Sequence, residues 1–402
     1  MLRMQKIKLL YSFLFCFVVQ SVYADDVSTI VPTTDKITIS DLTVEPGSDE
    51  TYSFTVSLEG DANTAHYYTA YDIQLTFPEG LDVALNSNGA YRVTMSKPSL
   101  YPYSVEEEEN EDGEIEEVKS YTHTLSCDFI SERCLRVITY SNEVEDFTKH
   151  SGSLFKVYVK ASPYLKPGPL PIKIHTVVLS ENREDGNGNY TVISHCPEDY
   201  YSNSIEADAT STIALKVSAA NKFGTCILPF DAELPVDGSF EAYTSASHTS
   251  DALILTKAEK IEAFAPYILY APEGYSATLS GTVDAAKYPA EGKVVAGNLV
   301  GTLVAEELTA GSYVMQNKGE GAMFYRVGDT PFSVGAGKCY VQFPGDVASV
   351  AMRFDTDVTG IDSVSSSSAD ESAPKYNIMG QRIQRPVPGH IYIQDGQKYI
   401  AR

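Results

Sequence analysis

Residues 36–60, KITISDLTVEPGSDETYSFTVSLEG, alternate apolar and polar side chains with a period of two on both sides of a turn. The turn is the Pro46-Gly47 pair, because proline lacks a backbone donor and glycine tolerates unusual backbone angles. A period of two is typical of β-strands with one buried face. The apolar set comprises Ile37, Ile39, Leu42, Val44, Tyr52, Phe54, Val56 and Leu58. This stretch therefore predicts strand, turn and strand.

The same alternation continues over the next 150 residues. It recurs in YYTAYDIQLTFPEGLDV (67–83), CLRVITYSN (134–142), GSLFKVYVKA (152–161), LPIKIHTVVLS (170–180) and YTVIS (190–194). Turn residues such as the Pro-Glu-Gly of 78–80 separate these runs. Eight or nine short strands with turns between them predict a β-sandwich.

Length and composition favour a multidomain, strand-rich chain. The 402 residues suggest two or three domains, and 27 tyrosines with 27 glycines and 20 prolines favour strands over helices. The net charge of −24 is unfavourable for binding nucleic acid or anionic lipid. Solubility alone is the alternative reason for such a charge.

The first 24 residues are typical of a secretory signal peptide. A basic start (Arg3, Lys6, Lys8) precedes the apolar run 9–19, and small residues lead to a predicted cleavage between Ala24 and Asp25. Removing them leaves 27 basic against 54 acidic residues, a net charge of −27. No later apolar run is long enough to cross a bilayer. We expect a secreted or extracellular protein.

The order of these strands resembles a cohesin-type module over about residues 35–211. The matching stretches are LTVEPGSDETYSFTVSL (42–58), AYDIQLTFPEGLDV (70–83), LRVITYSNEVEDFTKHSGSLFKVYVKA (135–161) and IKIHTVVLSENREDGNGNYTV (172–192). The resemblance implies an all-β, cohesin-like or carbohydrate-binding-module-like β-sandwich. It also implies a partner, since cohesin modules bind dockerins and related sandwiches bind polysaccharide.

An acidic segment, residues 104–120, interrupts this pattern between two strands. It carries nine acidic residues between Glu106 and Glu117. Like charges so close together predict a solvated, mobile loop or hairpin extension. Recruitment of cations or of a basic partner is the functional alternative.

Three further parts follow the sandwich. Residues 212–357 are again strand-rich, and LPF (228–230) and AGKCYVQFP (336–344) resemble a β-rich accessory module of secreted Bacteroidetes proteins. Residues 359–374 predict a serine-rich linker. The short tail 375–402 predicts two small β-hairpins. It resembles the sorting signal of the type IX secretion pathway, which implies passage across the outer membrane by that machinery and attachment to the cell surface.

No catalytic motif stands out, so we expect a non-enzyme. The seven histidines are scattered, and neither an HExxH pair nor a GxSxG elbow occurs. In EDGNGNY, Asp185, Asn187 and Asn189 alternate like oxygen ligands and are a candidate calcium site. A tight hairpin turn explains the same residues without a metal, and no other cofactor is expected.

Tyrosine and cysteine supply the remaining site predictions. If Tyr71 faces the core, the alternation puts Tyr68 on the outer face as a candidate ligand-binding residue.

Cys127 and Cys134 flank a turn and are one candidate disulfide. The other candidate, Cys226 with Cys339, joins the two ends of the second domain. The alternative is that every cysteine after the signal peptide is reduced and buried.

The sequence therefore predicts a non-catalytic secreted or cell-surface binding protein. Its cohesin-like sandwich would dock a protein partner or a polysaccharide, in keeping with polysaccharide utilisation. A structural or adhesive spacer and a glycan-degrading enzyme are the alternatives.

Overall fold

The computed structural model describes residues 30–64, 66–97, 99–109, 115–184, 190–197, 205–319, 321–355, 375–377, 381–383, 391–394 and 397–400. The predicted signal peptide with its cleavage residues Ala24 and Asp25, the calcium candidates Asp185, Asn187 and Asn189, and the predicted linker 359–374 lie outside these residues.

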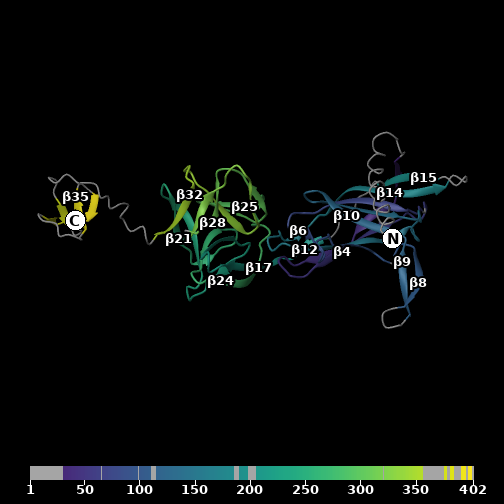
Figure 1. The fold of residues 1–402 in the computed structure, drawn as a ribbon, viewed down its shortest axis with the longest axis horizontal. Helices are drawn as coiled ribbons and strands as arrows, with labels where there is room; N and C mark the ends of the chain where they lie inside the picture. Colours follow the sequence, from purple (N-terminus) through teal and green to yellow (C-terminus); the bar gives the residue numbers. More distant parts are fainter. Residues whose placement is uncertain are drawn as a thin grey trace. The chain divides into compact units, whose positions relative to one another are not determined.

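The fold is all-β, as predicted: the described residues form strands, turns and loops, with no α-helix among them (Figure 1). The chain divides into two compact units. The first comprises Met1–Ala214 with Thr278–Tyr288, and the second comprises Leu215–Ala277 with Pro289–Arg402. The division at residue 214 lies near the expected boundary, but residues 278–288 belong to the first unit and not to a continuous second domain.

The first unit is a sandwich of two main sheets. The six-stranded sheet has the order β1 (Val31–Thr33), β15 (Tyr190–Pro197), β14 (Lys173–Glu184), β5 (Ala70–Thr76), β11 (Cys134–Ser141) and β10 (His123–Ser131). The five-stranded sheet contains β2 (Lys36–Ile39), β4 (Tyr52–Glu59), β12 (Ser151–Ala161) and β6 (Leu81–Val83), with β7 (Val93–Met95) also paired to β12. A small sheet joins β13 (Gly168–Pro169), β16 (Ile205–Ala207) and β3 (Leu42–Val44).

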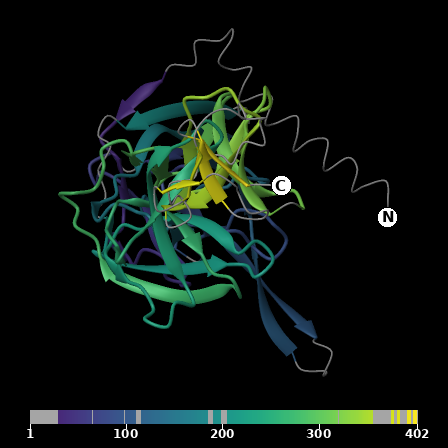
Figure 2. The same ribbon diagram turned by 90° about the vertical axis from the view of Figure 1, so that its left-hand side faces the viewer.

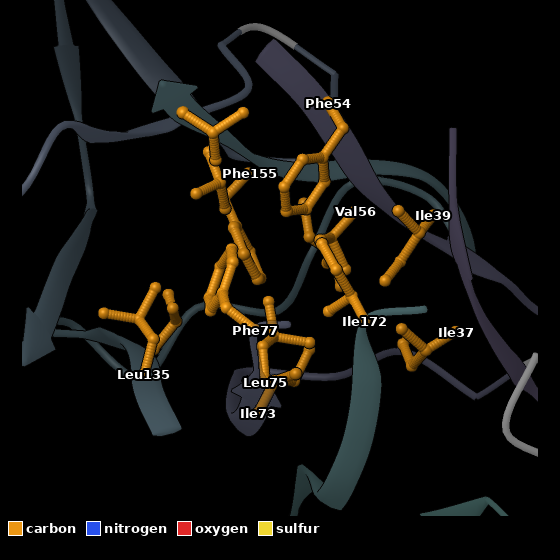
Figure 3. Packing of buried hydrophobic residues seen from close by; sticks show 14 of the residues in the cluster. Ile37, Ile39, Phe54, Val56, Ile73, Leu75, Phe77, Leu135, Phe155 and Ile172 are labelled. Atoms are coloured by element: carbon orange, nitrogen blue, oxygen red, sulfur yellow. The ribbon is translucent and has the colours of Figure 1, made fainter. Parts of the chain in front are cut away.

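The core lies between the two main sheets and includes six of the eight apolar residues predicted within 36–60, while the other two, Leu42 and Tyr52, are partly buried against it. Along β4 the burial pattern alternates, with Phe54, Val56 and Leu58 fully buried. Facing side chains from β5 and β12 complete the packing, and the Tyr71 and Phe155 rings stack with centroids 5.6 Å apart. Figure 3 shows the side chains of Phe54 and Val56 from one sheet packed with those of Ile73 and Leu75 from the other.

The predicted Pro46-Gly47 turn is present, and its glycine is required. Gly47 has a φ of 78°, a backbone conformation that residues with a Cβ rarely adopt. A Cβ at this position would lie 1.8 Å from the carbonyl oxygen of Thr212. The turn therefore brings the chain closer to a neighbouring backbone than any other residue permits.

The second unit is built on one ten-stranded sheet. Its order is β18 (Phe223–Ile227), β23 (Pro266–Tyr270), β20 (Glu241–His248), β21 (Ala252–Lys257), β32 (Ser349–Phe354), β29 (Ala322–Arg326), β28 (Ser312–Asn317), β31 (Lys338–Gln342), β26 (Leu299–Thr302) and β25 (Lys293–Ala296). Smaller pairs are β19 (Ala232–Glu233) with β22 (Lys260–Ile261), and β27 (Glu306–Leu308) with β30 (Phe332–Val334). The paired strands β17 (Thr210–Val217) and β24 (Tyr275–Thr282) each include residues of both units.

The described part of the tail forms one four-stranded sheet, where the sequence predicted two hairpins. The order is β34 (Arg382–Ile383), β33 (Lys375–Asn377), β35 (Ile391–Gln394) and β36 (Gln397–Ile400). Tyr376 pairs with both Arg382 and Ile393, so the two hairpins merge through β33 and β35.

We expect Phe155→Ala to lower the free energy of unfolding of the sandwich by about 3–5 kcal/mol, because it deletes a fully buried ring and leaves a cavity. Urea denaturation of the full chain followed by circular dichroism measures this change. The control Ile130→Ala removes an exposed side chain and should change the same quantity by less than about 0.5 kcal/mol. Equal losses in the two variants would contradict the assigned core.

Candidate functional site

A cluster of two histidines and a glutamate lies where β14 and β15 approach the loop that precedes β5. In the β14–β15 ladder, Leu179 pairs with His195, and both are buried on the inner face of the sheet. Glu181 follows Leu179 by two residues, so its side chain points to the same face. His66 comes from the loop and completes the cluster.

One carboxylate oxygen joins the three side chains. Oε2 of Glu181 lies 3.2 Å from Nδ1 of His66 and 3.1 Å from Nε2 of His195. The two imidazole rings have centroids 4.4 Å apart. The other carboxylate oxygen, Oε1, accepts a hydrogen bond of 3.2 Å from Arg183. These are the only three His, Cys, Asp or Glu side chains in the described part of the chain whose ligand atoms are grouped closely enough to hold a metal ion.

The electrostatics of the cluster favour a charged glutamate and a neutral buried histidine. Burial disfavours the ionised form of Glu181, but hydrogen bonds from Arg183 and His195 outweigh it and hold its pKa below the usual value. Burial, reinforced by repulsion from His66, lowers the pKa of His195. At neutral pH this combination presents an anionic oxygen and a nitrogen lone pair.

Tyr68 lies beside this cluster and not on the outer face, so the predicted exposure of Tyr68 was wrong. Its side chain is 0% exposed, and its hydroxyl donates a hydrogen bond to the buried carboxylate of Asp35. The strict alternation begins only with β5 at Ala70, so residue 68 belongs to a loop, where period two does not apply. The exposed tyrosine of this loop is Tyr67.

The cysteine predictions were also wrong, since all five cysteines in the described residues are free thiols. Cys127 pairs with Val137, and Cys134 pairs with Ser131, so the two cysteines are offset along the β10–β11 ladder. The thiol of Cys339 donates a 3.0 Å hydrogen bond to the carbonyl oxygen of Cys226, and both residues are buried. The alternative of reduced, buried cysteines applies to Cys134, Cys226 and Cys339; the other two, Cys127 and Cys196, are half-buried.

Of the two structures predicted for the acidic segment, a mobile loop and a hairpin extension, the described residues form the second, a paired ribbon. Strands β8 (Tyr103–Glu109) and β9 (Ile115–Tyr121) are antiparallel, and Figure 2 shows them extending away from the sandwich. Tyr103 lies opposite Tyr121 at its base, with ring centroids 5.3 Å apart. Lys97 and Lys119 place their ammonium groups over these two rings. Aromatic and β-branched residues between the glutamates therefore support strand pairing.

His123 is a buried histidine with a structural role. Its Nε2 donates to the carbonyl oxygen of Thr69 at 3.1 Å, and its Nδ1 lies 3.1 Å from the hydroxyl of Thr122. These bonds tie β10 to the start of β5. Burial lowers the pKa of His123 from its ordinary value of 6.5.

Comparison with known proteins finds solved cohesin modules among the structural neighbours of this chain. A cohesin of Clostridium thermocellum, solved in a cohesin–dockerin complex, is 13% identical, with a TM-score of 0.28, and the match covers 43% of this chain and 99% of that chain. A type III cohesin of Ruminococcus flavefaciens is 11% identical, with a TM-score of 0.28 and coverage of 46% and 93%. A cohesin module of a Clostridium perfringens family 33 glycoside hydrolase is 12% identical, with a TM-score of 0.26 and coverage of 41% and 99%.

Scores this low carry no argument about function, and the sandwich architecture rests on the strand order of the chain itself. No family model matches the chain, and no curated protein matches its sequence. A search of the described residues for helices of the length and apolarity needed to cross a membrane finds none.

We expect the sandwich to lose stability as the pH falls from 7 through 6.5. The unfolded chain protonates His123 near 6.5, whereas the folded protein resists protonation because its pKa is lowered. Thermal unfolding of the full chain at pH 7.0, 6.5, 6.0 and 5.5 measures the slope. A His123→Gln variant keeps a donor for Thr69 but does not titrate, so its slope should be smaller. An unchanged slope in that variant would show that His123 does not contribute.

Proposed function

We propose that the chain is a non-catalytic binding protein, secreted or displayed at the cell surface, whose N-terminal sandwich docks a protein partner. The observation that carries this proposal is the β8–β9 ribbon. It combines exposed apolar side chains with closely spaced glutamates on a paired, projecting element (Figure 2). The chemistry that complements it is a protein surface with lysines or arginines next to apolar residues.

The apolar part of the ribbon is accessible. Val105 is 50% exposed and Ile115 is 72% exposed, and they share one face of the ribbon with Tyr103. Exposed β-branched and aromatic side chains on adjacent strands can be buried by a partner. They supply the apolar contact that charge alone does not.

The charged part of the ribbon opposes its own pairing. Glu107 lies directly opposite Glu117, and like charges in that position destabilise a strand pair. Lys119 lies opposite Val105, with its ammonium group over the Tyr103 ring, and not opposite a glutamate. Positive groups from a partner would relieve this repulsion. The ribbon should therefore bind a surface more tightly when that surface carries more positive groups.

A protein partner is favoured over a polysaccharide. Polysaccharides are often bound by exposed aromatic side chains, but Tyr68, the predicted ligand-binding residue, is buried, and the chain contains no tryptophan. The sequence resemblance to cohesins, which bind dockerin proteins, agrees with this choice. The signal peptide and the sorting-like tail support an extracellular location, with the tail as the element that outer-membrane secretion machinery would recognise.

We expect a triple variant, Glu106→Lys, Glu107→Lys and Glu117→Lys, to lose the partner, with affinity falling at least about tenfold. Because Glu107 and Glu117 are opposite each other, reversing both keeps the repulsion within the ribbon and changes only its sign. The measurement is capture of proteins from the organism's own secreted and surface fractions by the immobilised full chain. Surface plasmon resonance with the captured partner at two salt concentrations then measures the affinity.

The matched control reverses three exposed acids of the second unit, Glu259, Glu273 and Asp329, so that the total charge change is identical. It should bind as the unaltered chain does. Capture of the same partner by the ribbon variant would contradict docking through β8–β9. A folded chain that retains no saturable partner would favour the spacer role.

A further inference from the structure

We propose that His66, Glu181 and His195 form a binding site for a divalent transition-metal ion of the zinc type. The site is separate from the ribbon and independent of the docking proposal. It uses two imidazole nitrogens and one carboxylate oxygen, a donor set that zinc accepts in proteins. The three side chains come from two neighbouring strands and one loop, so an ion at this point would tie the loop before β5 to the β14–β15 hairpin.

The spacing of the donors fits a small tetrahedral ion. Zinc bonds of about 2.0–2.1 Å imply ligand-to-ligand distances of about 3.3–3.4 Å around a tetrahedron. The observed separations are 3.2 Å from Nδ1 of His66 to Oε2 of Glu181 and 3.1 Å from Nε2 of His195 to that oxygen. The ligand atoms of all three side chains lie within 4.8 Å of one another, so binding requires the two imidazole nitrogens to come to within about 3.4 Å of each other.

The Nε2 of the buried His195 is the proposed metal donor, whereas its Nδ1 stays without a partner among the described residues with or without an ion. The side chain of His195 is 2% exposed. If Nε2 carries the proton and donates to Glu181, a lone pair is buried at Nδ1. If Nδ1 carries the proton, the Nε2 lone pair faces an anionic oxygen. A cation between Nε2 and Oε2 removes that repulsion, because both atoms then donate to it.

The surroundings orient the donors and leave access from solvent. The Tyr68 ring packs edge-on against His195 at a centroid distance of 5.5 Å, and Arg183 holds the second oxygen of Glu181. Such contacts around a metal site fix the directions of its ligands. His66 and Glu181 keep 23% and 17% of their side-chain surfaces exposed, so an ion can enter from that side.

The ligand chemistry selects the metal class. Imidazole suits zinc, copper and nickel, whereas calcium and magnesium prefer oxygen donors throughout. Three protein donors leave the fourth tetrahedral position for water. This site is thus distinct in place and in chemistry from the calcium site predicted at Asp185, Asn187 and Asn189.

The experiment is a titration of the purified, metal-free full chain with Zn²⁺ in competition with a chromophoric chelator. We expect one equivalent to bind, and we expect Co²⁺ in its place to give the visible absorption of a tetrahedral complex. His66→Gln and Glu181→Gln should each weaken Zn²⁺ binding at least about 100-fold, because each removes one of three donors. Bound Zn²⁺ should also raise the thermal unfolding midpoint of the unaltered chain, and not that of these variants.

The matched control is His175→Ala, which removes an exposed histidine from the same strand, β14. It should bind Zn²⁺ as tightly as the unaltered chain. Absence of Zn²⁺ binding by the unaltered chain would overturn the proposal without reference to any variant. Binding that survives both Glu181→Gln and His66→Gln would place the ion elsewhere and would overturn it equally.

Discussion

The apolar interface between the two main sheets of the first unit is the constraint on which the rest of that unit depends. Each strand contributes alternate side chains to this interface, and its centre is closed by fully buried residues such as Phe54, Ile73 and Phe155. Deep burial of this kind supplies most of the stabilisation of a sandwich. Polar groups outside this apolar interface gather beside it and on the projecting ribbon. Glu181 and His195 lie on the inner face of the six-stranded sheet next to the loop that carries His66, and the β8–β9 ribbon carries paired glutamates.

Several acidic residues of the sandwich have arginine partners among the described residues. Arg136 forms a two-pronged pair with Asp72 across adjacent strands of the six-stranded sheet. Arg133 donates to the carbonyl oxygens of Pro78 and Leu81 and so holds the turn after β5. On the ribbon, acidic side chains face one another instead. Acidic residues therefore stabilise the fold in one region and are available to bind a partner in another.

The two proposals differ in the type of recognition they require. Docking through the ribbon depends on exposed area and on long-range charge, and it is expected to weaken with salt. Metal binding at the cluster depends on positions of three atoms, and it is expected to respond to the loss of any one of them. Neither depends on the sheet of the second unit or on the tail, whose roles in presentation and sorting remain proposals from the sequence.

Local alternation was sufficient to predict the all-β class, the Pro46-Gly47 turn and most of the core, because side chains two residues apart on a strand share a face. Where the chain leaves a strand, that rule ends, and the exposure of Tyr68 was predicted wrongly for this reason. Disulfide pairing could not be inferred from spacing, since the ladder register sets which cysteines meet. The cluster of His66, Glu181 and His195 could not be predicted for the same physical reason: Glu181 lies 115 residues from His66 and 14 from His195. Strand pairing and loop packing bring these residues together, and no short sequence motif encodes either.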